Sequence, residues 1–403
     1  MARYESDDNS GAGETGVLRF GRRKAARYGV PVAVMGVTAA TIGLVPALAD
    51  SGDPSLPKIT AAQLIEKVAK SDVQQLSGTV KLTTDLGLPD LGGLESSLTS
   101  GAAPSAGGGS SADPTSKLTE LASGTHTLRV ATDGPEKQKL SLMESAAEYS
   151  LIHNGTNVWG YDSKSNEVYH GTAPQDGAQH KDETPATPKD FADEALKSVG
   201  DTTSVTVDGT MQVAGRDAYN LLVKPKQSGT TVGAISIGVD AKTGMPLKFT
   251  LTPASGGAAV IDVGFTQVSF AKPAASTFDF TPPKGAKVTE GNQGGEGGKS
   301  AAAPESKSGN DLAKGFKGYK VLGKGWNSIA TFDTGAKGGL PSGSSGGALG
   351  GFLNSLGDQV SGKFGKGTVF STRLVNALIT NDGKVYVGAV TKDALVKAAD
   401  SGQ

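Results

Sequence analysis

The chain has 403 residues, of which 36% are apolar and 5% aromatic, and 58 are Gly, a Gly share about twice the usual ~7%. Its formal net charge is −1, and it contains four His and no Cys. These figures exclude disulfides, thiolate metal sites, thiol nucleophiles, thioether lipid attachment and an overall polycation built for nucleic acid. The Gly excess indicates linkers, with the core confined to the segments between them.

The N-terminal segment has the order of an export signal. A basic cluster at residues 19–27 precedes an uncharged run at 28–48, and Ala47-Leu48-Ala49 closes it. This predicts a signal peptide over residues 1–49, cut after Ala49. The run is also long enough to span a bilayer of ~30 Å, so an uncleaved anchor remains open. Both alternatives predict an extracytoplasmic protein, either secreted or anchored to the cytoplasmic membrane by residues 28–48.

Three low-complexity stretches divide the remainder, at residues 87–116, 289–310 and 334–351. Such Gly/Ser-rich runs bury too little apolar surface to form a core. We take the second as the boundary between domains. The expected organisation is therefore a first domain over 50–288 with a Gly/Ser-rich insertion at 87–116, a flexible linker at 289–312, and a smaller domain at 313–403.

The first domain opens with a helix, because Thr60 and Gln63 form a capping box before an apolar face. Period-two patterns then predict strands, with Asp133-Gly134 and Asn154-Gly155 as hairpin turns. The expected strands are 76–85, 125–132, 138–144, 149–153, 157–161 and 166–169, then 204–213, 217–224, 232–239, 246–252 and 258–270. Thr187 and Pro188 predict a second helix between these two groups.

The second domain combines strands and helices. We expect a strand at 326–332, a helix at 352–360, and a hairpin of 373–380 and 384–390 around Asn381-Asp382-Gly383. Thr391 is expected to cap a last helix. The predicted fold class is α+β: a curved antiparallel sheet, or half-open barrel, covered by helices, plus a smaller C-terminal α+β domain, since a sheet this long must curl.

No catalytic constellation is found in the sequence, which predicts a protein that is not an enzyme and has no catalytic residues, no metal site and no cofactor. Asp240, Asp262 and Asp279 are dispersed, and we expect them in turns or solvent. His153 is expected to be exposed at a strand end. Few Arg remain beyond residue 49, and because phosphate recognition favours Arg, no nucleic-acid partner is expected.

A curled sheet under helices encloses an apolar space that can hold an acyl chain, if side chains do not fill it. Each buried CH₂ is worth about 0.8 kcal/mol. Strand alternation favours Leu140, Leu142, Leu222 and Phe249 as inward-facing contacts with such a chain.

Several sequence pieces together resemble the lipoprotein-carrier superfamily, which includes the LolA-type carriers and RseB-type sigma-factor regulators. They are the helix at 60–70 leading into 76–82, the strand pair at 154–162, Val213 to Tyr219, and Phe278-Asp279-Phe280-Thr281-Pro282-Pro283-Lys284-Gly285. Two shorter pieces, Asn166-Glu167-Val168 and Val239-Asp240 with Gly244-Met245-Pro246-Leu247, fit the same order. The resemblance covers about residues 58–290. It implies a half-open barrel with a helical lid that binds acyl chains of lipoproteins or related lipids without catalysis.

Trp159 and Tyr161 match the family's motif, and they are candidates either for the lipid cavity or for the sheet core. The second domain resembles the two-domain regulator type. This leaves an alternative function, an envelope-stress or sigma-factor regulator that binds a membrane protein as its partner.

Overall fold

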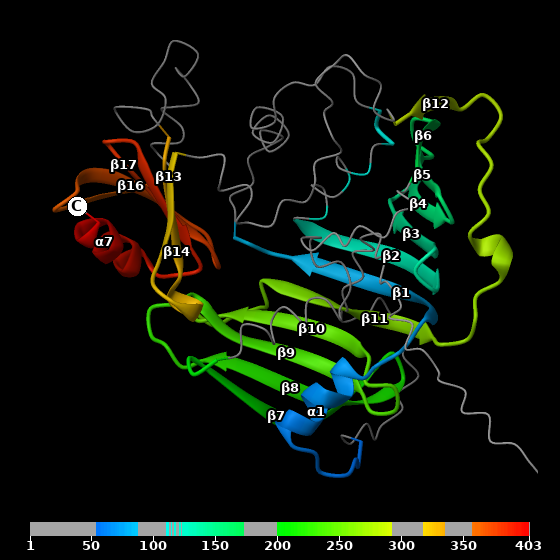
Figure 1. Ribbon diagram of the computed structural model, residues 1–403, viewed down its shortest axis with the longest axis horizontal. Coiled ribbons are helices and arrows are strands. Elements are labelled where there is room, and N and C mark those ends of the chain that lie inside the picture. Colours follow the sequence, from blue (N-terminus) through cyan, green and yellow to red (C-terminus); the bar gives the residue numbers. More distant parts are fainter. Residues whose placement is uncertain are drawn as a thin grey trace, which may run out of the picture.

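The computed structural model describes residues 54–87, 110–112, 114, 117, 121, 123–172, 200–291, 317–334 and 357–402. These residues form two β-sheets that lie side by side, a large one of twelve strands and a smaller one of six (Figure 1). The expected helix after Thr187 and the segment 28–48 lie outside the described residues.

The large sheet contains two antiparallel meanders joined in its centre. The elements are α1 (Ala61–Ala69), β1 (Gln75–Thr84), β2 (Gly124–Asp133), β3 (Lys137–Met143), β4 (Glu148–Asn154), β5 (Asn157–Asp162), β6 (Glu167–Thr172), β7 (Thr203–Val213), β8 (Arg216–Pro225), β9 (Val232–Asp240), β10 (Pro246–Pro253), β11 (Ile261–Ser269), the 3₁₀ turn η1 (Ala275–Thr277) and β12 (Lys287–Glu290). The strand order is β12-β6-β5-β4-β3-β2-β1-β11-β10-β9-β8-β7. The first strand of one meander, β1, thus pairs with the last strand of the other, β11.

The turns between these strands follow the sequence signals. Gly134 and Gly155 both adopt positive φ, a conformation that glycine reaches without steric cost, and each reverses the chain into an antiparallel partner. One pairing differs from the expected antiparallel pattern, because β12 runs parallel to β6. Between β11 and β12 the chain crosses the outer face of the sheet (Figure 1), and it therefore enters β12 running in the same direction as β6.

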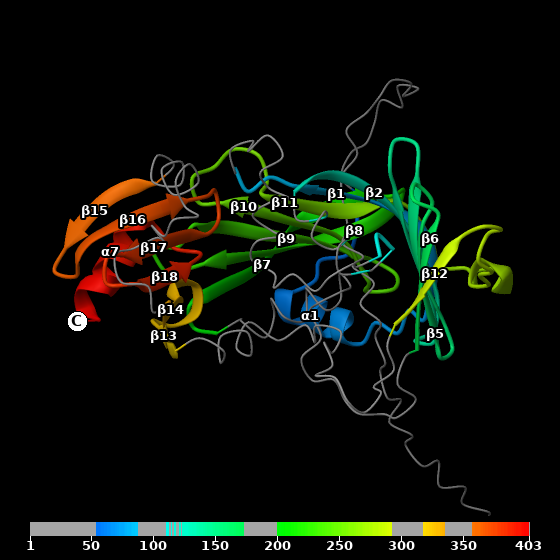
Figure 2. The same ribbon diagram turned by 90° about the horizontal axis from the view of Figure 1, so that it is seen from above.

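The large sheet curls without closing. β12 and β7 are its two edges and do not pair with each other, so it is an open, curved sheet. Figures 1 and 2 show that β3 to β6 stand at a steep angle to β7 to β11, with α1 on the concave side. The predicted curved sheet is confirmed. The helical cover is sparser than expected, because among the described residues α1 is the one α-helix that packs on this sheet.

The small sheet contains the C-terminal residues. Its elements are β13 (Lys317–Leu322), the 3₁₀ turn η2 (Gly325–Asn327), β14 (Ile329–Asp333), β15 (Asp358–Gly362), β16 (Gly365–Ser371), β17 (Asn376–Thr380), β18 (Lys384–Gly388) and α7 (Lys392–Ser401). The predicted Asp-Gly hairpin is confirmed between β17 and β18. Thr391 caps α7 as expected, and the buried Leu395 and Ala399 pack α7 into the core of this sheet.

Two expectations for this region are wrong. Residues from Asp358 onward form strand β15 rather than a helix, because they pair along β16, and this pairing outweighs the local helical pattern. Trp326 lies in η2, and the strand begins only at Ile329.

Polar contacts fix the small sheet against one end of the large sheet. The indole Nε1 of Trp326 donates to Thr203 Oγ1 at 2.9 Å, and the Thr230 hydroxyl donates to the Ala389 carbonyl at 2.9 Å. Arg373 Nη1 binds Asp85 Oδ2 at 2.5 Å. The two sheets therefore meet through the end of β1, the start of β7 and the loop before β9.

Candidate functional site

The concave face of the large sheet is continuously apolar. Strand register brings one side chain from each of five neighbouring strands into a row: Leu82, Val263, Phe249, Ile237 and Leu221. A second row leads from β11 through β1, β2 and β3 to β4, and its side chains are Phe265, Val80, Leu128, Leu142 and Tyr149. All ten side chains are buried in the two apolar clusters of this sheet. One face therefore carries a continuous layer of buried apolar side chains from β4 to β8.

Helix α1 covers the β7–β9 end of this face. Thr60 accepts a hydrogen bond from the amide of Gln63, whose side chain accepts one from the Thr60 amide, so the predicted capping box is confirmed. Leu64 and Val68 are fully buried against the strand residues of the second cluster. The Tyr219 hydroxyl donates to the Pro57 carbonyl at 2.9 Å and holds the approach to the helix in place.

Residues 110–112, from the end of the predicted insertion, cover the opposite end of the concave face. The Tyr149 hydroxyl donates to the Ala112 carbonyl at 3.1 Å. Gly160 makes this approach possible, because a Cβ there would clash with the Ala112 carbonyl oxygen. Leu121 packs against the first apolar cluster. We call residues 110–112 the latch.

Glu167 holds the latch on the sheet. Its carboxylate accepts hydrogen bonds from the Ser111 amide at 2.8 Å and the Ser110 hydroxyl at 3.0 Å. The hydrogen bond from Lys287, followed by those from Ser111 and Ser110, lowers the pKa of Glu167 to about 2. The carboxylate is therefore ionised over the physiological range, and the latch is held by a charged acceptor.

Three of the six predicted lipid contacts lie on the concave face. Leu140, Leu142 and Phe249 are 5%, 3% and 6% exposed and belong to the apolar clusters. The expectation that Leu222 also faces inward is wrong. Its neighbours Leu221 and Val223 occupy the concave positions, so Leu222 opposes Ser236 on the convex face.

Trp159 and Tyr161 also lie on the convex face, since Gly160 between them faces the latch. Trp159 stacks on His170 with ring centroids 3.8 Å apart, and Phe280 packs against both Trp159 and Tyr161. The segment carrying Phe280 runs along the outer side of β4 to β6 (Figure 1). The two motif aromatics therefore pack between the sheet and this segment.

The dispersed carboxylates have structural partners. Asp240 is buried and accepts hydrogen bonds from Arg216 Nε at 2.5 Å and from the amide and hydroxyl of Thr243 at 2.6 and 2.8 Å. Burial would raise the pKa of Asp240, but the hydrogen bonds from Arg216 and Thr243 outweigh it, and the pKa is lowered. Asp262 lies 3.7 Å from Lys248 Nζ.

His153 is buried rather than exposed, which corrects the expectation from its place at a strand end. It is 4% exposed on the concave side, opposite Gln138, and its ring nitrogens make no hydrogen bond of normal geometry to a described residue, although backbone groups of Gly155 and Pro135 lie near them. Burial is the main cause that lowers the pKa of His153.

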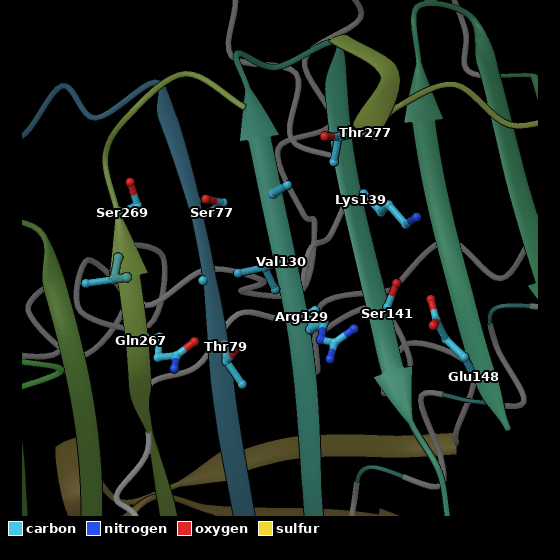
Figure 3. Close-up of a pocket in the computed structure, with 13 residues that line it drawn as sticks. Ser77, Thr79, Arg129, Val130, Lys139, Ser141, Glu148, Gln267, Ser269 and Thr277 are labelled. Atoms are coloured by element: carbon cyan, nitrogen blue, oxygen red, sulfur yellow. The ribbon is translucent and has the colours of Figure 1, made fainter. Parts of the chain in front are cut away.

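A pocket of about 550 Å³ opens on the convex face, lined by Ser77, Gly78, Thr79, Arg129, Val130, Ala131, Lys139, Ser141, Glu148, Gln267, Val268, Ser269 and Thr277 (Figure 3). Sequence reasoning missed it, because its polar side chains alternate with core residues as those of a plain solvated face do. The signal was the rarity of Arg beyond residue 49, since Arg129 lies in this pocket.

The part of the chain that the structure describes contains neither a candidate metal site nor a candidate membrane-spanning helix. No group of three or more His, Asp or Glu there could hold a metal ion. Within the same residues, no helix is both long and apolar enough to cross a membrane.

The chain resembles solved structures at low identity, whereas no protein-family model and no curated protein matches it. MucB in its complex with MucA from Pseudomonas aeruginosa is 15% identical with a TM-score of 0.37, over 84% of this chain and 96% of that one. A LolA superfamily protein from Nitrosomonas europaea is 11% identical with a TM-score of 0.21, over 55% and 99%. An uncharacterised conserved protein from Thermus thermophilus is 12% identical with a TM-score of 0.30, over 57% and 98%. Proteins of the MucB type and of the LolA superfamily are therefore among the solved structures to which the chain has a low similarity.

Proposed function

We propose that the protein is a non-enzymatic, extracytoplasmic binding protein that holds acyl chains of lipoproteins or lipids on the concave face of its large sheet. The observation that carries the proposal is the continuous layer of buried apolar side chains from β4 to β8 on one side of a sheet that does not close. Burial of an acyl chain there is worth about 0.8 kcal/mol per CH₂ before the costs of binding.

In this proposal the acyl chain enters between α1 and the latch. The latch is attached by hydrogen bonds to Tyr149 and Glu167, which can break and re-form without loss of the apolar core. Leu140 and Leu142 lie on the strand next to Tyr149 and would contact the chain beneath the latch. After the acyl chain leaves, the latch would again form its hydrogen bonds with Tyr149 and Glu167 and cover the concave face.

Fluorescence quenching by a spin-labelled fatty acid tests which face binds. We expect Leu140→Trp on the concave face to be quenched by doxyl-stearate. The matched variant Leu222→Trp, on the convex face of β8, should report only the background of the native tryptophans. Leu251→Trp, at the edge of the concave face, is the second reporter if Leu140→Trp does not fold. Equal quenching at Leu140 and Leu222, or none at either concave position, contradicts the proposal.

A second candidate function is an envelope-stress or sigma-factor regulator that binds a membrane protein. The observation in its favour is edge strand β13 of the small sheet, where Val321 is 51% exposed. An exposed edge strand can pair with an extended peptide through its free backbone groups. Capture of a membrane protein that persists after lipid is removed, and that Val321→Pro abolishes, would favour this function.

A further inference from the structure

Strand pairing brings polar side chains from four neighbouring strands, β11, β1, β2 and β3, together at the base of the convex pocket. Arg129 on β2 lies opposite Thr79 on one side and Ser141 on the other, and Thr79 lies opposite Gln267. Thr277, from the segment that crosses the outer face, closes one end (Figure 3). The pocket is thus on the opposite side of the sheet from the apolar face.

Two cations in this pocket make no hydrogen bond or ion pair to a carboxylate among the described residues, although their charges act on the nearby Glu148. The chain beyond residue 49 contains three Arg. Arg216 is bound by Asp240 and Arg373 by Asp85. Arg129, by contrast, makes no side-chain hydrogen bond or ion pair with any described residue, and the same is true of Lys139, which lies on the adjacent strand. Unpaired cations clustered over a polar floor attract an anion.

Glu148 is the one carboxylate among the residues that line the pocket, and serine side chains occupy its oxygens through hydrogen bonds. The Ser150 hydroxyl donates to Glu148 Oε1 at 2.7 Å, and the Ser141 and Ser150 hydroxyls lie 2.9 Å apart. Burial would raise the pKa of Glu148, but the serine hydrogen bonds and the charges of Lys139 and Arg129 outweigh it, so the pKa is lowered. Glu148 thus stays an ionised hydrogen-bond acceptor and leaves the pocket with a net positive charge.

We propose that this pocket binds the anionic group, phosphate or carboxylate, of a small hydroxyl-bearing molecule. Arg129 and Lys139 contact the anion, and Glu148 accepts a hydrogen bond from a hydroxyl of the same molecule. A volume of about 550 Å³ suits a small molecule. The inference goes beyond the proposed acyl binding, because it concerns the other face of the sheet.

Calorimetric titration of the full chain in non-ionic detergent tests the site. The probes are glycerol 3-phosphate and glucuronate, with glycerol and glucose as neutral analogues. We expect the anions to bind and the neutral analogues to fail. Arg129→Gln and Lys139→Gln should each weaken anion binding by about tenfold or more, the size expected for loss of a charge-assisted hydrogen bond. Lys224→Gln, an exposed cation on the convex face of β8, should bind as the wild type does.

Binding to lipid vesicles distinguishes a lipid headgroup from a free small molecule as the source of the anion. Binding to phosphatidylcholine vesicles that increases with added phosphatidylglycerol and falls in Arg129→Gln assigns the anion to a headgroup. Binding of the soluble probes alone assigns it to a free molecule. Absence of binding in both arms, or equal binding by wild type and Arg129→Gln, overturns the proposal. The fatty-acid quenching at Leu140 is unaffected by either result, so the two proposals fail separately.

Discussion

Gly160→Ala should release the latch from the concave face without removing any apolar side chain. The new Cβ would clash with the Ala112 carbonyl and lie 3.1 Å from the Tyr149 hydroxyl. The latch then loses its hydrogen bond from Tyr149 and one of its three hydrogen bonds to Glu167, which come from the Ser110 hydroxyl and from the amide and hydroxyl of Ser111. A neutral hydrogen bond contributes about 1 kcal/mol and one to a charged group about 1.5–3 kcal/mol, so we expect a loss of about 2–4 kcal/mol in latch closure.

Hydrogen exchange measured by mass spectrometry on the peptide that contains residues 110–112 reports this loss. We expect its exchange in Gly160→Ala to accelerate by about 30-fold or more, since 1.4 kcal/mol corresponds to a factor of ten. An acyl fluorophore should also bind faster to this variant. Gly200→Ala is the matched control, because a Cβ at Gly200 meets nothing within 4 Å. Unchanged exchange of the latch in Gly160→Ala would refute the assigned role of Gly160.

Three further predictions concern stability, each read from thermal or urea unfolding. The pKa of His153 is lowered below 6.5 in the folded chain, so its contribution to the free energy of unfolding is complete above pH 6.5 and declines as the pH falls below that value. His153→Phe should therefore make the free energy of unfolding depend less steeply on pH below 6.5. An unchanged pH dependence in this variant would contradict the role of His153. Arg216→Met should destabilise the protein by about 3–5 kcal/mol, because it leaves the buried Asp240 without its cation. Leu64→Ala should cost about 2–5 kcal/mol through the cavity that it leaves beneath α1, and a cost below 1 kcal/mol would show that α1 is not packed on the sheet.

Local signals in the sequence predicted most of the fold. The Thr60–Gln63 capping box located α1, and the Gly-containing turns located the hairpins, because both signals act within a few residues. The run at 352–360 misled the prediction, since strand β15 is stabilised by pairing with β16, which a local pattern does not report.

The faces of the strands were harder to predict than the strands themselves. Leu221, Leu222 and Val223 are consecutive apolar residues, so alternation alone gives two equally good assignments, and only the register with β9 decides between them. Trp159 and Tyr161 lie on the convex face because Phe280, more than a hundred residues later, packs on them there. Contacts of this range leave no periodic signal in the sequence.

Native mass spectrometry of the protein isolated from its host tests most directly whether the concave face holds acyl chains. We expect adducts whose masses correspond to acyl-bearing lipids or lipoproteins, and we expect a competing fatty acid to release them. Protein that is isolated without such adducts, and that does not shift the emission of an acyl fluorophore, would contradict acyl binding by this face.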